Sequence, residues 1–202
     1  MKELLAILDQ AYDRRSWHGT NLRGSIRSVS ARQAAWRPGP SRHNIWELVV
    51  HAAYWKYAVR RRLTGESRGS FPLKGSNWFE RPQAGATARL KSMRRNTAFT
   101  AELAEPAERI PRSSRRSLRA LRLNVASVLK TDAADAWRSD IELLDQMHRA
   151  LRDAVARQSP RLLDRRIAGS RDTRFSLITG AAAHDLYHAG QIQLLKRLAP
   201  NR

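Results

Sequence analysis

Helical periodicity, with almost no strand pattern, is the feature that most limits what this chain can fold into. Four stretches repeat apolar residues three and four positions apart, which is the spacing of one face of an α-helix. They cover residues 1–29, 44–63, 133–157 and 175–198. Four amphipathic helices without a sheet bury their apolar faces most simply against one another, so we predict an all-α fold, an antiparallel four-helix bundle.

Local signals mark where these helices begin and end. The first stretch is interrupted by a turn around residues 16–19. The second stretch opens on Asn44, an N-cap residue that is followed three positions later by Glu47, and it closes at Gly65. Because a capping box and a C-terminal glycine fix both ends, we predict a sharply bounded second helix.

The segment 83–131 differs in composition from the four stretches. Ala, Arg and Ser dominate it, Pro106 and Pro111 interrupt it, and its apolar pattern is weak until Leu118. We interpret it as an Arg-rich insertion, partly disordered and with one short helix, inside a single domain of residues 1–202. A chain of 202 residues with 42% apolar content is long enough to bury one core.

The net charge of +20 raises the question of an acidic partner. Residues 84–130 hold eleven Lys or Arg against three Glu, and the other positive charges are scattered over the helices. No basic stripe interleaved with aromatic residues accompanies the charge, so nucleic-acid binding is the minority interpretation. We expect a small-molecule substrate instead.

The chain has no cysteine, which excludes disulfides, thiolate metal ligands and a cysteine nucleophile. A metal must therefore be held by nitrogen and oxygen ligands, and any thiol in a reaction must come with a substrate. No run of about 18 apolar residues is present, and the first residues lack the apolar centre of a signal peptide. We expect a cytoplasmic protein that does not enter a membrane.

The last helical stretch places His184 and His188 four residues apart. Residues at this spacing lie on one face of a helix, so both imidazoles can reach one metal ion. His51 lies on the core-facing side of the second stretch and is the natural third ligand. Three neutral imidazoles leave a coordination position open, as in a catalytic site. The alternative is that each histidine is an ordinary core residue with a hydrogen-bond partner.

Further residues carry weaker hypotheses. His148 is either a fourth ligand or proton donor, or packs at the edge of the core. Gln191, one turn beyond His188, either orients a metal ligand from behind or is a buried amide. Asp185 faces away from the histidines, and we expect it to pair with an arginine. The side chains that could wall an apolar pocket over the metal are those of Trp17, His18, Tyr54, Trp55, Trp78 and Phe79.

Three motifs resemble the DinB-like superfamily. They are the Asn-Ile-Trp-Glu-Leu-Val-Val-His run that ends at His51, the Gly-Ser-Asn-Trp loop at 75–78 and the His-Asp-Leu-Tyr-His-Ala-Gly-Gln-Ile run at 184–192. The superfamily includes YfiT-type metal-dependent hydrolases and the bacillithiol- and mycothiol-dependent transferases. The resemblance covers residues 1–82 and 132–198. It implies a four-helix bundle in which His51, His184 and His188 bind a divalent metal, and it implies a homodimer.

The chemistry remains open between several classes. Zinc or nickel is the first choice of metal, although imidazole also suits iron and copper. An open tris-histidine metal activates either water or an incoming low-molecular-weight thiol. No carboxylate lies on the histidine face of the last helix, which favours a thiol S-transferase acting on small electrophiles in detoxification or stress response. A metal-dependent hydrolase and a non-enzymatic, metal-stabilised binding module, with or without nucleic acid, are the alternatives.

Overall fold

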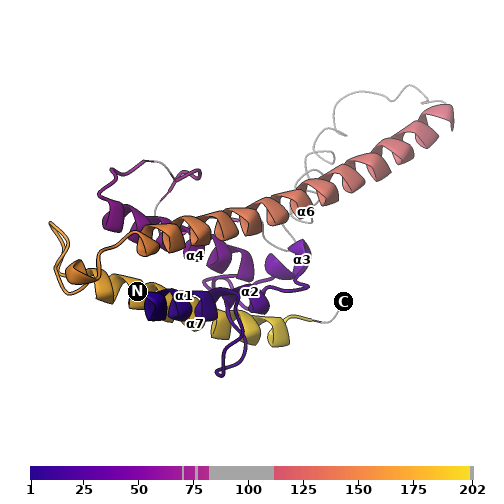
Figure 1. The fold of residues 1–202 in the computed structure, drawn as a ribbon. Coiled ribbons are helices and arrows are strands. Elements are labelled where there is room, and N and C mark those ends of the chain that lie inside the picture. Colours follow the sequence, from indigo (N-terminus) through magenta and orange to yellow (C-terminus); the bar gives the residue numbers. More distant parts are fainter. Residues whose placement is uncertain (70, 76, 82–111, 201–202) are drawn as a thin grey trace.

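A computed structural model describes residues 1–69, 71–75, 77–81 and 112–200, and only the backbone of residues 112–132. Within these residues the chain contains helices and no β-strand. In chain order the elements are α1 (Lys2–Tyr12), α2 (Leu22–Ser25), α3 (Ala31–Ala34), α4 (Ile45–Thr64), α6 (Arg112–Ala156), the 3-10 turn η1 (Pro160–Leu162) and α7 (Arg174–Leu198). Figure 1 shows the longer helices packed side by side. The predicted all-α bundle is confirmed.

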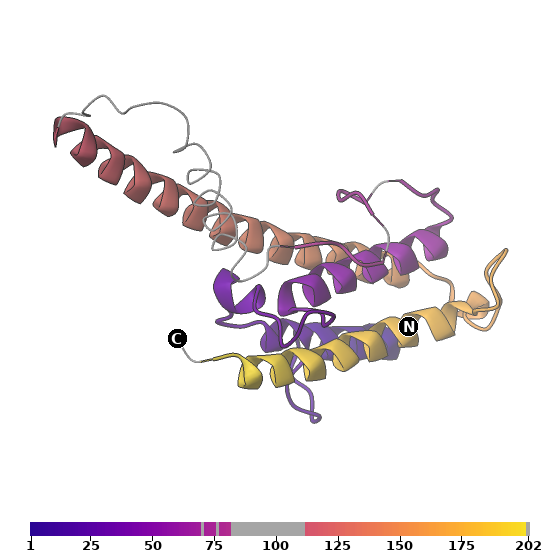
Figure 2. The ribbon, with the colours of Figure 1, turned by 180° about the vertical axis from the view of Figure 1, so that it is seen from behind.

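The four bundle helices α1, α4, α6 and α7 run two in each direction. In Figures 1 and 2, α1 and α7 point one way, and α4 and α6 point the other way. Side-chain contacts agree for α4 and α6: the Trp46 indole donates to Asp140 at 2.6 Å near one end, and Gln158 donates to the Leu63 carbonyl at 3.5 Å near the other. Because these consecutive long helices are parallel, the chain needs a long connection between them.

The ends of α4 are those that the sequence predicts. The Asn44 side chain accepts from the Glu47 backbone N–H at 2.8 Å, and the Glu47 carboxylate accepts from the Asn44 N–H at 3.4 Å. At the other end Gly65 has φ 75°, a left-handed conformation that glycine adopts without a steric penalty. This capping fixes which α4 residues face the core.

The N-terminal region forms a longer helix and two short ones. The predicted interruption is confirmed, since α1 ends at Tyr12 and α2 begins only at Leu22. Val29 was expected to belong to a helix, but it lies between α2 and α3. It is buried, and its carbonyl accepts from the Trp137 indole at 2.8 Å. Tertiary packing therefore replaces helical hydrogen bonding at this position.

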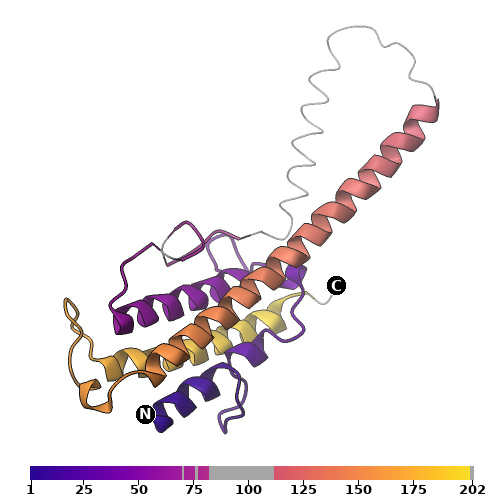
Figure 3. The ribbon, with the colours of Figure 1, turned by 45° about the horizontal axis from the view of Figure 1, so that its top comes forward.

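The start of α6 corrects the predicted third helix. Its backbone is helical from Arg112, not from Ala133, so the segment 112–131 is part of a long helix and not a separate short one. Neither glycine nor proline occurs between residues 112 and 156. Figure 3 shows this part of α6 projecting beyond the other helices. The predicted disorder at 83–111 lies outside the described residues.

The apolar core consists of two clusters that flank the histidines of α7. One cluster surrounds Trp46 and Trp137, and the other surrounds Leu8 and Leu151. On α7, the two histidines lie between Ala182 of the second cluster and Ile192 of the first. The polar rings are thus held on a rigid helix that is packed on both sides of them. No helix among the described residues is long and apolar enough to cross a membrane.

Candidate metal centre

The imidazoles of His51, His184 and His188 meet between α4 and α7. The Nε2 atom of His184 lies 3.2 Å from Nε2 of His51 and 3.0 Å from Nε2 of His188. Each ring offers one nitrogen within 4.8 Å of the other two, and the three residues together could hold a metal ion. No second group of this kind occurs in the part of the chain that the structure describes. The sequence-predicted trio is therefore brought together.

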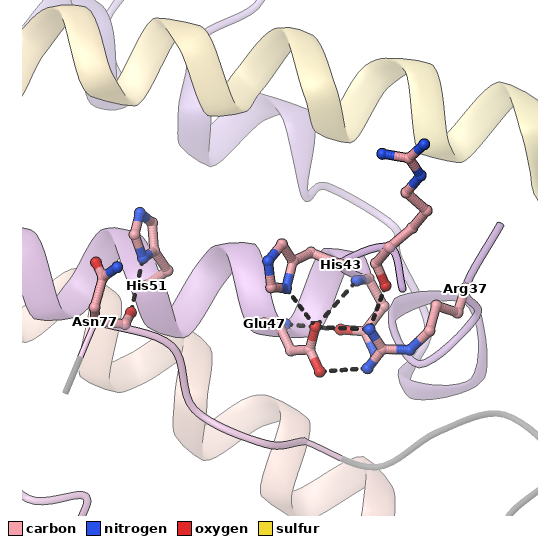
Figure 4. A network of polar contacts seen from close by, with 7 residues as sticks. Arg37, His43, Glu47, His51 and Asn77 are labelled. Carbon is pink, nitrogen blue, oxygen red and sulfur yellow. Dashed lines mark hydrogen bonds and ion pairs between the residues drawn. The ribbon is translucent and has the colours of Figure 1, made fainter. Parts of the chain in front are cut away.

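Hydrogen bonds from behind fix the orientation of two of the rings. Nδ1–H of His51 donates to the Asn77 carbonyl at 2.7 Å, and Nδ1–H of His188 donates to Oε1 of Gln191 at 2.6 Å. Figure 4 shows the first of these contacts. A neutral imidazole has one N–H, so both rings present an Nε2 lone pair to the centre.

This donor set fits a metal ion. His184 can donate at most one proton from Nε2, so hydrogen bonding leaves at least one of the two facing lone pairs without a partner. A cation placed between the rings would satisfy all three nitrogens. Metal-bound histidines in proteins generally donate their other N–H to a carbonyl or a side chain, as His51 and His188 do here.

Burial keeps the three imidazoles neutral. It is the main cause that lowers the pKa of His51, of His184 to about 3 and of His188 to about 4. For His184 the neighbouring histidines and Lys56 lower the pKa further. Neutral nitrogens are the ligand-competent form, so near pH 7 no proton has to leave before a metal binds.

The loop after α4 supplies one wall of the centre. Trp78 stacks on His51 with ring centroids 3.9 Å apart, and His43 stacks on Trp78 at 3.6 Å. The Trp55 indole donates to the Asn77 side chain at 2.8 Å and holds the loop in place. Asn77 itself has φ 62°, which asparagine tolerates better than most residues. The loop thus positions both the carbonyl and the aromatic ring that contact His51.

A polar network anchors the start of α4, one turn before His51. The Glu47 carboxylate accepts from Arg37 and contacts His43 Nδ1 at 3.0 Å (Figure 4). Burial raises the pKa of Glu47, but the hydrogen bonds from Arg37 and His43 outweigh it, and the pKa is lowered overall. The ionised carboxylate connects the N-terminus of α4 to the segment before it.

A groove of about 430 Å³ opens beside the centre, between α4 and α7. Of the six candidate wall residues, Trp55 and Trp78 line it. Tyr54 lines a neighbouring cavity, Phe79 is buried in the core, and Trp17 is 96% exposed and His18 exposed, so these four do not line the groove. The full lining is His51, Trp55, Lys56, Val59, Arg62, Asn77, Trp78, Ser176, Leu177, Gly180, Ala181, His184 and Asp185.

A buried ion pair lies under the groove, and sequence reasoning missed its cationic member. Asp185 accepts from Lys56, and both side chains are almost fully buried. The expected arginine partner was wrong, because Lys56 on α4 reaches Asp185 across the helix interface. Burial raises the pKa of Asp185, and Lys56 opposes this effect. The one signal in the sequence is that Lys56 interrupts the otherwise apolar and aromatic run 52–59.

His148 lies in a separate polar cluster. Its ring stacks on Tyr12 with centroids 3.7 Å apart, and it lines a cavity of about 650 Å³ together with Asp9 and Arg152. Its Nδ1 atom is buried and has no hydrogen-bond partner in the part of the chain that the structure describes. Burial lowers its pKa to about 3. The structure therefore does not bring His148 together with the three converging rings, which are contributed by α4 and α7.

Comparison with known protein families identifies the superfamily of this chain. The family model of the DinB superfamily matches residues 14–192. The chain belongs to the DinB superfamily. The DinB match contains all three histidines, and it also spans 83–131, which the resemblance left out. No curated protein and no solved structure gave a match. For this DinB superfamily member, the histidine geometry and the family both support a protein that is able to bind a metal.

Proposed function

We propose that His51, His184 and His188 hold one divalent metal ion, with zinc or nickel as the first choice, and that Gln191 orients His188 for it. The single observation that carries this proposal is the convergence of three Nε2 atoms, two of which must present lone pairs. Nε2 of His184 lies 3.2 Å from one of these lone pairs and 3.0 Å from the other, and its single proton can satisfy only one of them, so the other has no partner without a cation between the rings.

We further propose that the protein is a metal-dependent thiol S-transferase that acts on small electrophiles in detoxification or stress response. When bound, the metal supplies a Lewis acid that holds a thiol as its thiolate. The chain has no cysteine, so the thiol is a co-substrate. In an addition reaction, sulfur bonds to the electrophilic carbon and the thiol proton ends on the adjacent carbon, so no other reactant is consumed.

The groove residues favour this class over a hydrolase. Hydrolysis generally needs a general base near the reacting water. Of the described residues that line the groove, Asp185 is the one carboxylate, and Lys56 already donates to it. The aromatic and aliphatic walls, Trp55, Trp78 and Val59 among them, suit an apolar electrophile and keep water away from the reacting atoms.

A conjugation assay tests the proposal. Purified protein loaded with zinc or nickel is mixed with bacillithiol or mycothiol and chlorodinitrobenzene, and the product is followed by absorbance. In this substitution the thiol sulfur replaces chloride on the ring carbon, and chloride and the thiol proton are released to the solvent. We expect turnover by the native chain and at least a hundredfold loss in His188→Ala, with full activity in His148→Gln as the buried-histidine control. Metal binding without turnover of any thiol favours the non-enzymatic binding module instead.

We also propose a homodimer that forms through the outer face of α7. Tyr187, Leu194 and Leu198 are exposed on this helix at spacings of seven and four residues, which places them along one side of it. Large apolar side chains in a row on an exposed helix generally mark an interaction surface. The same face on a second copy is its simplest partner.

A further inference from the structure

Among the described residues, the groove contains one cation that is not neutralised at short range. Lys56 is already neutralised by its buried ion pair with Asp185. Arg62, by contrast, lies at the groove end remote from the histidines, and its ion pair with Asp172 is 3.9 Å long, beyond hydrogen-bonding distance. Its side chain is 33% exposed. A guanidinium with such a long ion pair can bind an anionic ligand without first breaking a strong contact.

The α4 residues show how far Arg62 is from the histidines. His51, Trp55, Val59 and Arg62 follow one another at steps of four, four and three, and all of them line the groove. They therefore share one face of α4. The eleven helical steps from His51 to Arg62 correspond to about 16 Å along the helix axis. A ligand that contacts both ends must be elongated, and its middle must be apolar because Trp55 and Val59 lie between them.

The α7 side of the groove leaves room for such a ligand. It is built from Ser176, Leu177, Gly180 and Ala181, which are mostly small. A Cβ atom placed on Gly180 would meet no atom of the described residues within 4 Å. Glycine destabilises a helix interior relative to alanine, and here no neighbouring atom requires it. The open space beside Gly180 is therefore available to a ligand.

We infer that Arg62 is a specificity-determining residue that selects electrophiles with an anionic group at one end. The anion, a carboxylate, sulfonate or phosphate, binds the guanidinium by a charge-assisted hydrogen bond. The apolar middle lies against Trp55 and Val59, and the electrophilic carbon lies at the three histidines. This inference rests on the proposed function for the statement that the ligand end at the histidines is the electrophile. The position of the ligand in the groove can be tested without any turnover.

The test compares octanesulfonate with octanol, which have the same chain length, by calorimetry on metal-loaded and metal-free protein. Sulfonate is a poor metal ligand, so a preference for it reports the groove and not the metal. We expect octanesulfonate to bind about fivefold more tightly, as for one charge-assisted contact at a partly exposed site. Arg62→Gln should abolish this preference. Arg61→Gln should keep it, because Arg61 does not line this groove.

A second pair of variants tests where the ligand lies. Gly180→Leu fills the open space, and we expect it to weaken both probes at least tenfold, whereas Gly180→Ala should bind them like the native chain. Both changes improve helix propensity, so misfolding does not explain a loss. Equal affinities for the two probes, a preference that survives Arg62→Gln, or full binding by Gly180→Leu would each overturn the inference. Probe binding as expected, together with no thiol conjugation, would contradict the transferase proposal and leave the groove assignment intact.

Discussion

Nε2 of His51 on α4 lies 3.2 Å from Nε2 of His184 on α7, although 133 positions separate the two residues in the chain. The packing of two antiparallel helices produces this approach, and the capping of α4 fixes which of its residues take part. Each end of the arrangement is held separately, by Asn77 behind His51 and by Gln191 behind His188. We therefore expect the residues that orient the histidines to control metal affinity, and residues elsewhere in the core to control stability.

Replacing Gln191 should weaken metal binding without unfolding the protein. Gln191→Ala removes the acceptor that fixes the His188 tautomer, and such partners typically contribute about tenfold to a hundredfold in metal affinity. Competition titration with a chromophoric chelator measures the change. Gln193→Ala, on the same helix, should bind metal like the native chain. Equal affinities in the two variants would show that Gln191 is an ordinary amide.

The Lys56–Asp185 pair should affect stability because each buried charge neutralises the other. Lys56→Met leaves the Asp185 carboxylate buried without a partner, which typically destabilises a protein by about 3–5 kcal/mol. The double variant Lys56→Met/Asp185→Leu removes both charges, and we expect it to recover most of that loss. Urea unfolding of the metal-free proteins measures both. A double variant as unstable as the single one would contradict this account.

Acidification should destabilise the metal-free protein, partly through His148. Its pKa is lowered from 6.5 to about 3 on folding, so below pH 6.5 the unfolded chain binds the proton more readily, and stability falls as the pH falls. His184 and His188 act in the same direction. His148→Phe keeps a ring against Tyr12, and we expect it to reduce the loss between about pH 7 and pH 4.5 by roughly 2–3 kcal/mol.

Urea midpoints at the two pH values provide this measurement. A His148→Phe variant with the same pH dependence as the native chain would show that His148 takes up its proton equally well in the folded state. Because His148 lies outside the group of three converging rings, its replacement should leave metal binding unchanged at neutral pH.

The proposed dimer should depend on the outer face of α7. Leu194→Glu places a charge in the middle of the exposed apolar row, which is strongly unfavourable in a buried interface. We expect light scattering to report a monomer for this variant and a dimer for the native chain. Gln193→Glu adds the same charge at the neighbouring position and should remain a dimer. A native chain of monomer mass would remove this part of the proposal.

The sequence was most informative where local chemistry decides the structure. Asn44, Glu47 and Gly65 set the ends of α4 through contacts within a few residues, and the four-residue spacing of His184 and His188 holds for any helix. The start of α6 was missed because the Arg- and Ser-rich residues before Leu118 have a weak apolar pattern. The weak apolar pattern was therefore interpreted as a break in the helix.

Contacts across the fold were less predictable. The Asn77 carbonyl orients His51 only because the loop after α4 folds back over the helix, and nothing near His51 in the sequence indicates this. Asp185 pairs with Lys56 because the α4–α7 interface brings a lysine, and not an arginine, to that depth. Arg62 likewise gains its place in the groove from the packing of two helices.

Elemental analysis of protein purified without an affinity tag tests the central claim most directly. We predict one divalent ion per native chain, a loss of at least nine tenths of it in His51→Gln, and full retention in His148→Gln, whose ring is buried elsewhere. A native chain that binds no metal when offered zinc or nickel, or a His51→Gln variant that keeps its ion, would contradict the account.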